Sequence, residues 1–173
     1  MRDEPSQDER YLAAADEFGP ALQRLARASE ANPERQRDLL QDMHVALWRS
    51  LNGFDGRCSM RTWVYRVAHN VAASHVDRER RSRRGLVTLD EIDQLPDAAD
   101  IGADYETNDQ VARLNAIIRQ LKQPDRQIIT LYLEELDAAS IAEIVGLSPG
   151  AVATRISRFK SNLARLFRET NHV

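Results

Sequence analysis

Two basic segments carry the side chains whose types and spacing could do chemistry, and the chemistry they predict is nucleic-acid binding. The first runs from Arg57 to Arg84 and holds eight arginines against Asp77 and Glu79, a local charge of +6 in a chain whose formal net charge is −3. Aromatic residues, among them Trp63, lie at its start. Aromatic rings stack on unpaired bases, and arginines bind phosphates. This segment therefore predicts contact with nucleic acid.

The second basic segment, residues 146–173, has five lysines or arginines and one acid, Glu169. Turn-forming residues here predict a short helix, a tight turn and a longer helix. Gly146 can adopt the left-handed conformation that ends the first helix, Ser148 can cap the second and Pro149 can open it. This is the pattern of a helix-turn-helix, a motif that places its second helix in the major groove of DNA.

The longer helix of this motif has one apolar and one polar, basic face. At roughly 100° per residue, the expected buried stripe comprises Val152, Ile156, Phe159, Leu163, Leu166 and Phe167. The opposite face comprises Gly150, Thr154, Ser157, Arg158, Ser161 and Arg165. A charged helix face is usually only solvated, but this one carries no acid and coincides with the capped turn, which favours DNA. We expect base-edge contacts from Thr154, Ser157 and Arg158, and phosphate contacts from Arg155, Lys160 and Arg165.

The first basic segment also predicts a helix with two faces. One face comprises Val64, Val67, Ala68, Val71 and His75, and the other comprises Arg66, His69, Asn70, Ala73, Asp77, Arg80 and Arg84. Trp63 lies at the flank, where two interpretations stay open: packing against the core, or stacking on an opened base. Phe54 is expected to lean towards the core. The arginine run 78–84 could be a solubilising end, but its neighbours favour phosphate binding.

Helices are expected on both sides of an acidic stretch. Asn32 and Pro33 predict a helix start, and an apolar face of Leu40, Met43, Leu47 and Leu51 follows. A weaker helix is expected over residues 11–25, another over 111–121 ending before Pro124, and another from Ile128. No segment alternates with period two for long enough to be a strand. The prediction is an all-α fold with two small helical domains.

Residues 86–109 are expected to form a flexible linker between the two domains. This stretch has eight acids, no lysine or arginine, and both Pro96 and Gly102. The predicted organisation is therefore a helical domain over residues 1–85, an acidic linker over 86–109 and a helix-turn-helix domain over 110–173.

Several function classes are excluded or disfavoured by composition. The single cysteine, Cys58, rules out an internal disulfide and a zinc site built from cysteine pairs, and the four histidines show no metal-binding spacing, so no metal and no cofactor is expected. No phosphate-binding glycine loop or nucleophile motif is present, and we expect no enzyme activity. No bilayer-spanning run or signal peptide is evident, which predicts a cytoplasmic protein without membrane insertion.

Two blocks of sequence resemble a known family. The chain resembles, from about Tyr11 to Phe167, a bacterial RNA polymerase sigma factor of the extracytoplasmic-function (ECF) group in the sigma-70 family. The family's region two is similar to RDLLQDMHVALWRSLNGFDGRCSMRTWVYRVAHN, and its region four is similar to LKQPDRQIITLYLEELDAASIAEIVGLSPGAVATRISRFKSNL. The chain departs from the residues usual in the family at Arg37, His44 and Ala153.

The resemblance implies roles for individual residues. The helix that docks on the polymerase clamp is matched by Asp38, Gln41, Asp42 and Trp48, and loop 52–58 matches the one that receives a flipped base of the minus-ten element. With the arginine run added, the expected minus-ten set is Asn52, Phe54, Arg57, Arg61, Trp63, Arg66, Asn70, Arg78, Arg80, Arg81 and Arg84. The expected minus-thirty-five set is Thr154, Arg155, Ser157, Arg158, Lys160 and Arg165.

The implied function is promoter recognition, DNA melting and transcription initiation in the bacterial cytoplasm, in association with the nucleoid. The implied partners are core RNA polymerase, through the clamp of its beta-prime subunit and the flap of its beta subunit, promoter DNA, and an anti-sigma factor. Promoter elements about two helical turns apart lie roughly 70 Å from each other. The linker of 24 residues can extend to roughly 80 Å, so both domains could engage one duplex.

Two alternatives stay open. A sigma-like decoy could titrate an anti-sigma factor without binding a promoter, but it would need neither the arginine run nor the basic recognition helix. A plain helix-turn-helix repressor would leave residues 33–84 unexplained.

Overall fold

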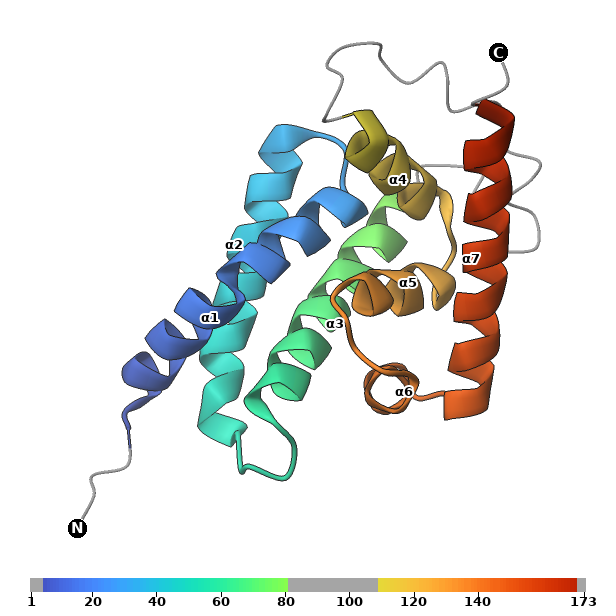
Figure 1. The fold of residues 1–173 in the computed structure, drawn as a ribbon. Helices are drawn as coiled ribbons and strands as arrows, with labels where there is room; N and C mark the ends of the chain where they lie inside the picture. Colours follow the sequence, from blue (N-terminus) through green and yellow to red (C-terminus); the bar gives the residue numbers. More distant parts are fainter. Residues whose placement is uncertain (1–4, 81–108, 171–173) are drawn as a thin grey trace. The chain divides into compact units, whose positions relative to one another are not determined.

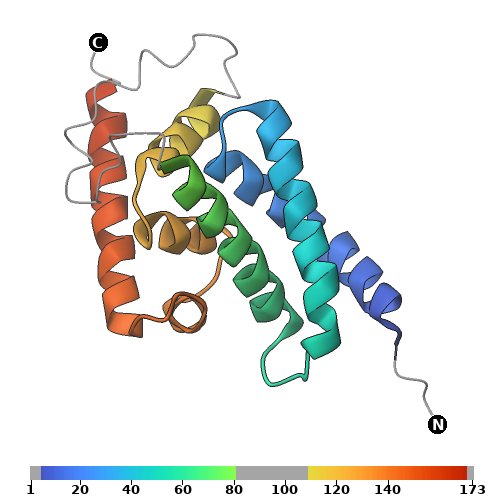
Figure 2. The same cartoon turned by 180° about the vertical axis from the view of Figure 1, so that it is seen from behind.

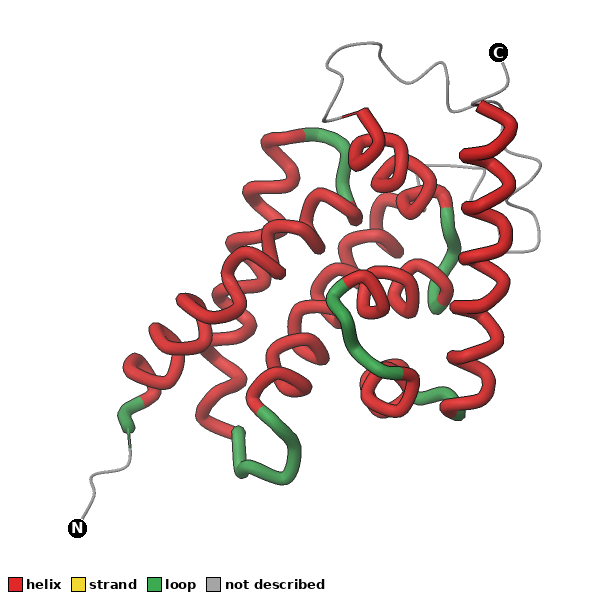
Figure 3. The backbone as a smooth tube through the Cα atoms, in the orientation of Figure 1, coloured by secondary structure: helices red, strands yellow, loops and turns green. Residues whose placement is uncertain are grey.

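A computed structural model describes residues 5–80 and 109–170, and within these ranges the chain is helical, with no β-strand (Figure 3). This confirms the predicted all-α class. The chain folds as two compact units, Met1–Ser82 and Arg83–Val173, and each is described by itself. The predicted linker lies outside the described residues except for its last residue, as do Arg81 and Arg84. The linker therefore stays a prediction.

The first unit is a three-helix cluster (Figure 1) made of α1 (Gln7–Ser29), α2 (Pro33–Ser50) and α3 (Met60–Arg80). A short 3-10 turn, η1 (Leu51–Gly53), follows α2. Helix α1 starts with a capping box, in which the Ser6 hydroxyl accepts from the Glu9 N–H and the Glu9 carboxylate accepts from the Ser6 N–H. Helix α2 starts as predicted, because the Asn32 side chain accepts two N–H groups of the first turn.

The three helices lie side by side in the views from the front and from behind (Figures 1 and 2), and the core of this unit lies between them. The fully buried side chains there are Leu22, Leu39, Met43, Leu47 and Leu51. The buried residues of α2 recur every fourth position and begin at Leu39. The sequence instead predicted that this apolar face begins at Leu40. Leu40 is only half-buried, because the seam with α1 and α3 follows the four-residue row.

Helix α3 is buried over a wider arc than its sequence predicted. His69, expected on the polar face with Asn70, is only 3% exposed and lies beside the ring of Tyr65, so that prediction was wrong. Helix α3 packs against both α1 and α2, and two neighbours cover more of its surface than one apolar stripe suggests. Burial disfavours the charged imidazolium and lowers the pKa of His69 to about 3.

A contact between Glu30 and His75 joins the α1–α2 corner to the C-terminal half of α3. Glu30 is 3% exposed, and one of its oxygens lies 3.0 Å from His75 Nε2 while the other accepts the Asn32 N–H. Burial alone would raise the pKa of Glu30, but the Asn32 N–H and His75 together hold that pKa below its usual value. Arg35 of α2 and Glu79 of α3 form an ion pair that is more exposed, and each lies four or five positions after a residue of the first contact.

The second unit contains α4 (Asp109–Gln120), α5 (Asp125–Leu133), α6 (Ala138–Val145) and α7 (Pro149–Thr170). The helix-turn-helix is confirmed in its details. Asp137 caps α6 by accepting the Ser140 N–H, and Gly146 ends it at φ 74°, in the left-handed region that favours glycine. Ser148 Oγ accepts the Ala151 N–H, and Pro149 is the first residue of α7.

The core of the second unit is formed by α5, α6 and α7 together with the end of α4. Val152 and Phe159 are buried as predicted, while Ile156, Leu163 and Leu166 are half-buried, and the Phe167 side chain lies outside the described set. The largest fully buried side chains are Ile118, Leu121, Ile128, Ile129, Leu131 and Phe159.

Candidate nucleic-acid interface

The outward face of α7 presents the predicted recognition residues together. Thr154, Ser157, Arg158, Lys160 and Arg165 are all exposed on this one helix. The Thr154 hydroxyl donates to the Gly150 carbonyl at 2.9 Å, which leaves its oxygen as an acceptor. A polar, basic helix of this kind has the donors and acceptors that read base edges in a major groove.

Arg155 differs from the other predicted residues of α7. It is half-buried, and its guanidinium pairs with Asp125 at the start of α5, a carboxylate that is 4% exposed. This pair joins α7 to α5, a structural role that the sequence did not predict. A phosphate contact by Arg155 would compete with Asp125, and it stays a prediction.

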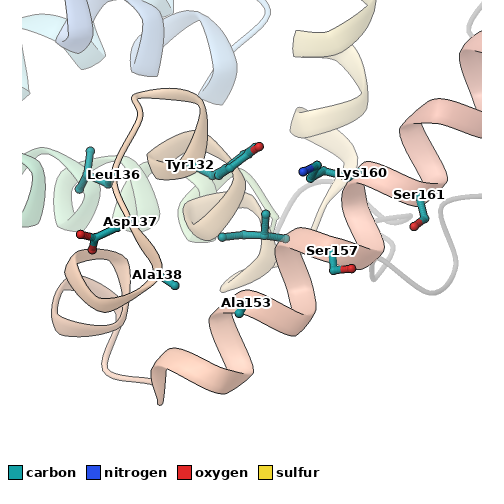
Figure 4. Close-up of a pocket in the computed structure, with 9 residues that line it drawn as sticks. Tyr132, Leu136, Asp137, Ala138, Ala153, Ser157, Lys160 and Ser161 are labelled. Atoms are coloured by element: carbon teal, nitrogen blue, oxygen red, sulfur yellow. The ribbon is translucent and has the colours of Figure 1, made fainter.

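A hollow of about 460 Å³ lies between the α5–α6 connection and α7 (Figure 4). Tyr132 and Asp137 line it from one side and Ala153, Ser157 and Lys160 from the other. The small side chain of Ala153 helps to leave this space open. The hollow adjoins the outward face of α7 because Ser157 and Lys160 belong to both.

The loop before α3 is ordered by short-range contacts. Gly56 adopts φ 75°, and the Asp55 carboxylate accepts the Arg57 N–H and pairs with its guanidinium. The Arg57 N–H is the main reason that the pKa of Asp55 lies below its usual value. Ser59 caps α3 by accepting the Thr62 N–H at 3.1 Å. These contacts hold residues 55–59 in a defined turn before α3, and exposed Asn52 lies just before it in η1.

Trp63 is half-buried and makes two packing contacts. Its indole N–H donates to Ser50 Oγ at 3.0 Å, and its ring meets Phe54 edge to face with centroids 5.4 Å apart. The sequence left open whether Trp63 packs against the protein or stacks on a base, and in this structure Trp63 is packed. Stacking of Trp63 on an opened base stays a prediction.

The remaining minus-ten candidates lie along α3. Asn70 and Arg78 are exposed and Arg66 is half-buried, while Arg61 lies 5.8 Å from the centroid of the Tyr65 ring. The Arg80 side chain lies outside the described set. The structure thus brings the loop and the exposed side of α3 together in one unit, but it does not test contact with DNA.

The predicted polymerase-docking residues share one helix. Asp38, Gln41 and Asp42 are exposed on α2, and Trp48 is 40% exposed towards its C-terminal end. Sequence reasoning missed Val45, also 40% exposed, although its place at i+4 from Gln41 and i−3 from Trp48 puts it on the same stripe. This surface therefore combines carboxylates with exposed apolar side chains.

Two absences apply to the described ranges 5–80 and 109–170. No helix there is both long and apolar enough to cross a membrane. No group of three or more histidine, cysteine, aspartate or glutamate side chains is gathered closely enough there to hold a metal ion.

Family models match both units. The model "Sigma-70 region 2" matches residues 15–82, and "Sigma-70, region 4" matches residues 112–163. The chain is 29% identical to "ECF RNA polymerase sigma factor SigG" of Mycobacterium tuberculosis over 73% of its own length. It spans only 40% of that relative's length. "RNA polymerase sigma factor CnrH" of Cupriavidus metallidurans is 28% identical, with 86% of this chain and 81% of the relative covered.

Two solved structures share the fold. CnrH in complex with the cytosolic domain of CnrY has a TM-score of 0.64 at 25% identity, covering 92% of this chain and 88% of the other. The sigma factor RpoE in complex with the anti-sigma factor NepR from Bartonella quintana has the same TM-score at 19% identity, covering 89% of this chain and 94% of the other.

Proposed function

Because this chain belongs to the ECF group of the sigma-70 family, we propose that it binds core RNA polymerase and directs it to promoters. The observation that carries the proposal is the helix-turn-helix unit, whose exposed α7 face gathers Thr154, Ser157, Arg158 and Lys160 without an acid among them. The chain contributes recognition and melting, and the partner polymerase carries out RNA synthesis.

Each unit has a separate task in this mechanism. Helix α7 enters the major groove at the minus-thirty-five element, where Thr154, Ser157 and Arg158 meet base edges and Lys160 and Arg165 meet phosphates. In the first unit, the 52–58 loop and the exposed side of α3 receive the opened minus-ten element. A single strand suits this surface because an unstacked base can enter a loop that a duplex cannot.

The partners follow from the same surfaces. The exposed side of α2, with Asp38, Gln41, Asp42 and Trp48, docks on the clamp of the beta-prime subunit, and the second unit contacts the flap of the beta subunit. An anti-sigma factor is a further partner, since both solved structures named above hold a sigma factor with such a protein or its CnrY counterpart. The protein acts on the nucleoid in the bacterial cytoplasm. A pure decoy would have no need of the basic α7 face.

Transcription with core polymerase tests the proposal. The purified chain, core polymerase and a pool of genomic promoter fragments should give transcripts with discrete start sites that are missing when either protein is omitted. The chain alone should bind promoter duplex weakly, because each unit offers a small footprint. The same start sites produced by core polymerase without the chain would refute the proposal.

Arg158→Ala is expected to relax sequence preference at one position of the upstream element. A good base contact contributes roughly 1–3 kcal/mol of discrimination, whereas Arg165→Ala should weaken all sequences alike and reduce the dependence of binding on salt. The measurement is holoenzyme affinity for a set of single-base promoter variants at several salt concentrations. Parallel, sequence-independent losses for both variants would contradict the assignment of Arg158 to a base.

A further inference from the structure

Trp48 is exposed to solvent, yet its indole ring is held by a hydrogen bond to a distant residue. Its side chain is 40% exposed on the side of α2 that carries the docking residues. Yet its indole N–H donates to Asp8 Oδ1 at 2.8 Å, a contact between residues 40 positions apart in the chain. An exposed tryptophan is usually free to change rotamer, so a partner that fixes its only polar atom restricts the ring to one orientation.

The first turn of α1 makes a second contact with the same residue. Gln7 Nε2 donates to the backbone carbonyl of Trp48 at 2.7 Å. That carbonyl belongs to the last turn of α2, so Gln7 joins the start of α1 to the end of α2. One turn further along α1, the Tyr11 hydroxyl lies 3.1 Å from His44 Nδ1. The start of α1 therefore runs along the end of α2.

Two exposed apolar side chains lie one helical turn from the residues of this contact. Leu12 is 64% exposed and lies one helical turn after Asp8, and Val45 is 40% exposed and lies one turn before Trp48. Helical spacing puts Leu12 on the side of α1 that carries Asp8, and Val45 on the side of α2 that carries Trp48. We call Leu12, Val45 and Trp48 the apolar patch. Such a cluster beside Asp38, Gln41 and Asp42 has the apolar centre and polar rim of a protein interface.

We propose that Asp8 is a positioning residue for polymerase binding, and that the start of α1 is part of the docking surface. Asp8 holds the Trp48 indole in the orientation that the clamp meets, while Leu12 and Val45 widen the apolar contact around it. This inference rests on the proposed function, because its partner is core polymerase. It extends that function to residues 7–12, which lie before the first family match at residue 15.

The physical basis is pre-organisation. Immobilising a mobile side chain at an interface costs affinity, by a factor of roughly two to twelve for each such side chain. Asp8 removes that cost for Trp48 before the partner arrives. The role depends on an oxygen acceptor at this point and not on negative charge, so asparagine should replace aspartate with little loss.

The test is a double-mutant cycle measured by the affinity of the full chain for core polymerase. Asp8→Ala should weaken binding roughly two- to twelvefold, the cost of immobilising one freed side chain at the interface. Asp8→Asn should bind like the wild-type chain. Trp48→Phe keeps an aromatic ring but has no N–H, so in that background Asp8→Ala should have no further effect. Glu17→Ala is the matched control, because this exposed carboxylate lies about 180° around α1 from Asp8.

A second measurement separates orientation from folding. In a Trp63→Phe background, Trp48 is the only indole, and Asp8→Ala should lower its steady-state fluorescence anisotropy while the thermal midpoint of the chain stays within a few degrees.

The outcomes are distinguishable. Failure of the wild-type chain to bind core polymerase would overturn the proposed function itself. If the wild-type chain binds, three results would each overturn the inference alone: Asp8→Ala binding like the wild type, Asp8→Ala weakening binding equally with Trp48 or phenylalanine at position 48, or Asp8→Asn weakening binding as much as Asp8→Ala. The second would mean that Asp8 acts independently of the Trp48 N–H, and the third that it acts through its charge.

Discussion

Phe159→Ala should lower the free energy of unfolding of the second unit by about 3–5 kcal/mol, the largest effect expected of a single substitution in this chain. Phe159 is 1% exposed and is one of the largest fully buried side chains of the unit. Truncation removes its transfer free energy and leaves a cavity among α5, α6 and α7. Small domains are stable by only about 5–15 kcal/mol, so the loss is a large part of the total.

This substitution separates support of the recognition helix from contact with DNA. Phe159 lies on the buried side of α7, while its neighbours Arg158 and Lys160 are exposed. Phe159→Ala should therefore abolish promoter-specific initiation through loss of folding, and Lys160→Ala should leave the thermal midpoint nearly unchanged. Circular-dichroism melts of both variants, with Phe159→Leu as a milder apolar substitution, measure the difference. A midpoint for Phe159→Ala equal to that of the wild type would show that α7 does not depend on this contact.

Acid should destabilise the first unit because of His69. Its folded-state pKa of about 3 lies below the ordinary value of 6.5, so the unfolded chain takes up the proton first as the pH falls. Stability is therefore unaffected by His69 above pH 6.5 and is lost progressively between pH 6.5 and 3. At about 1.4 kcal/mol per pH unit, the loss reaches roughly 2 kcal/mol at pH 5.

His69→Gln should remove most of this dependence, since glutamine has no proton to gain in this range. Urea unfolding at pH 7.5 and at pH 5 would measure it, with the change between the two pH values as the readout, so that any packing cost of the substitution cancels. Burial also lowers the pKa of His44, and His44→Gln measures that smaller contribution in the same direction. The stability that Glu30 contributes is lost only as the pH falls below its ordinary pKa of 4.5, which lies outside the measured range of pH 7.5 to 5. Equal changes in the wild type and in His69→Gln would contradict the assignment.

Much of the fold was predictable because helix ends are determined by nearby residues. Asn32 and Pro33 start α2, Gly146 ends α6, and Ser148 with Pro149 starts α7, all as the sequence predicted. Capping and backbone conformation act over three or four residues, so one sequence contains all the information they need. The two blocks that resemble the family depend on sequence in the same way, and both family models match them.

The helical class, the helix-turn-helix and the exposed residues of α7 were predictable from the residue order alone, because helical period and local capping specify which side chains share a face. The features that depend on packing between helices were not predictable in this way: Leu39 in place of Leu40 at the core, the burial of His69, the Arg155–Asp125 pair across 30 positions, and the Trp48–Asp8 hydrogen bond. The physical reason is that burial depends on how many neighbours cover a helix and at what angle they cross it, and no local period contains that information.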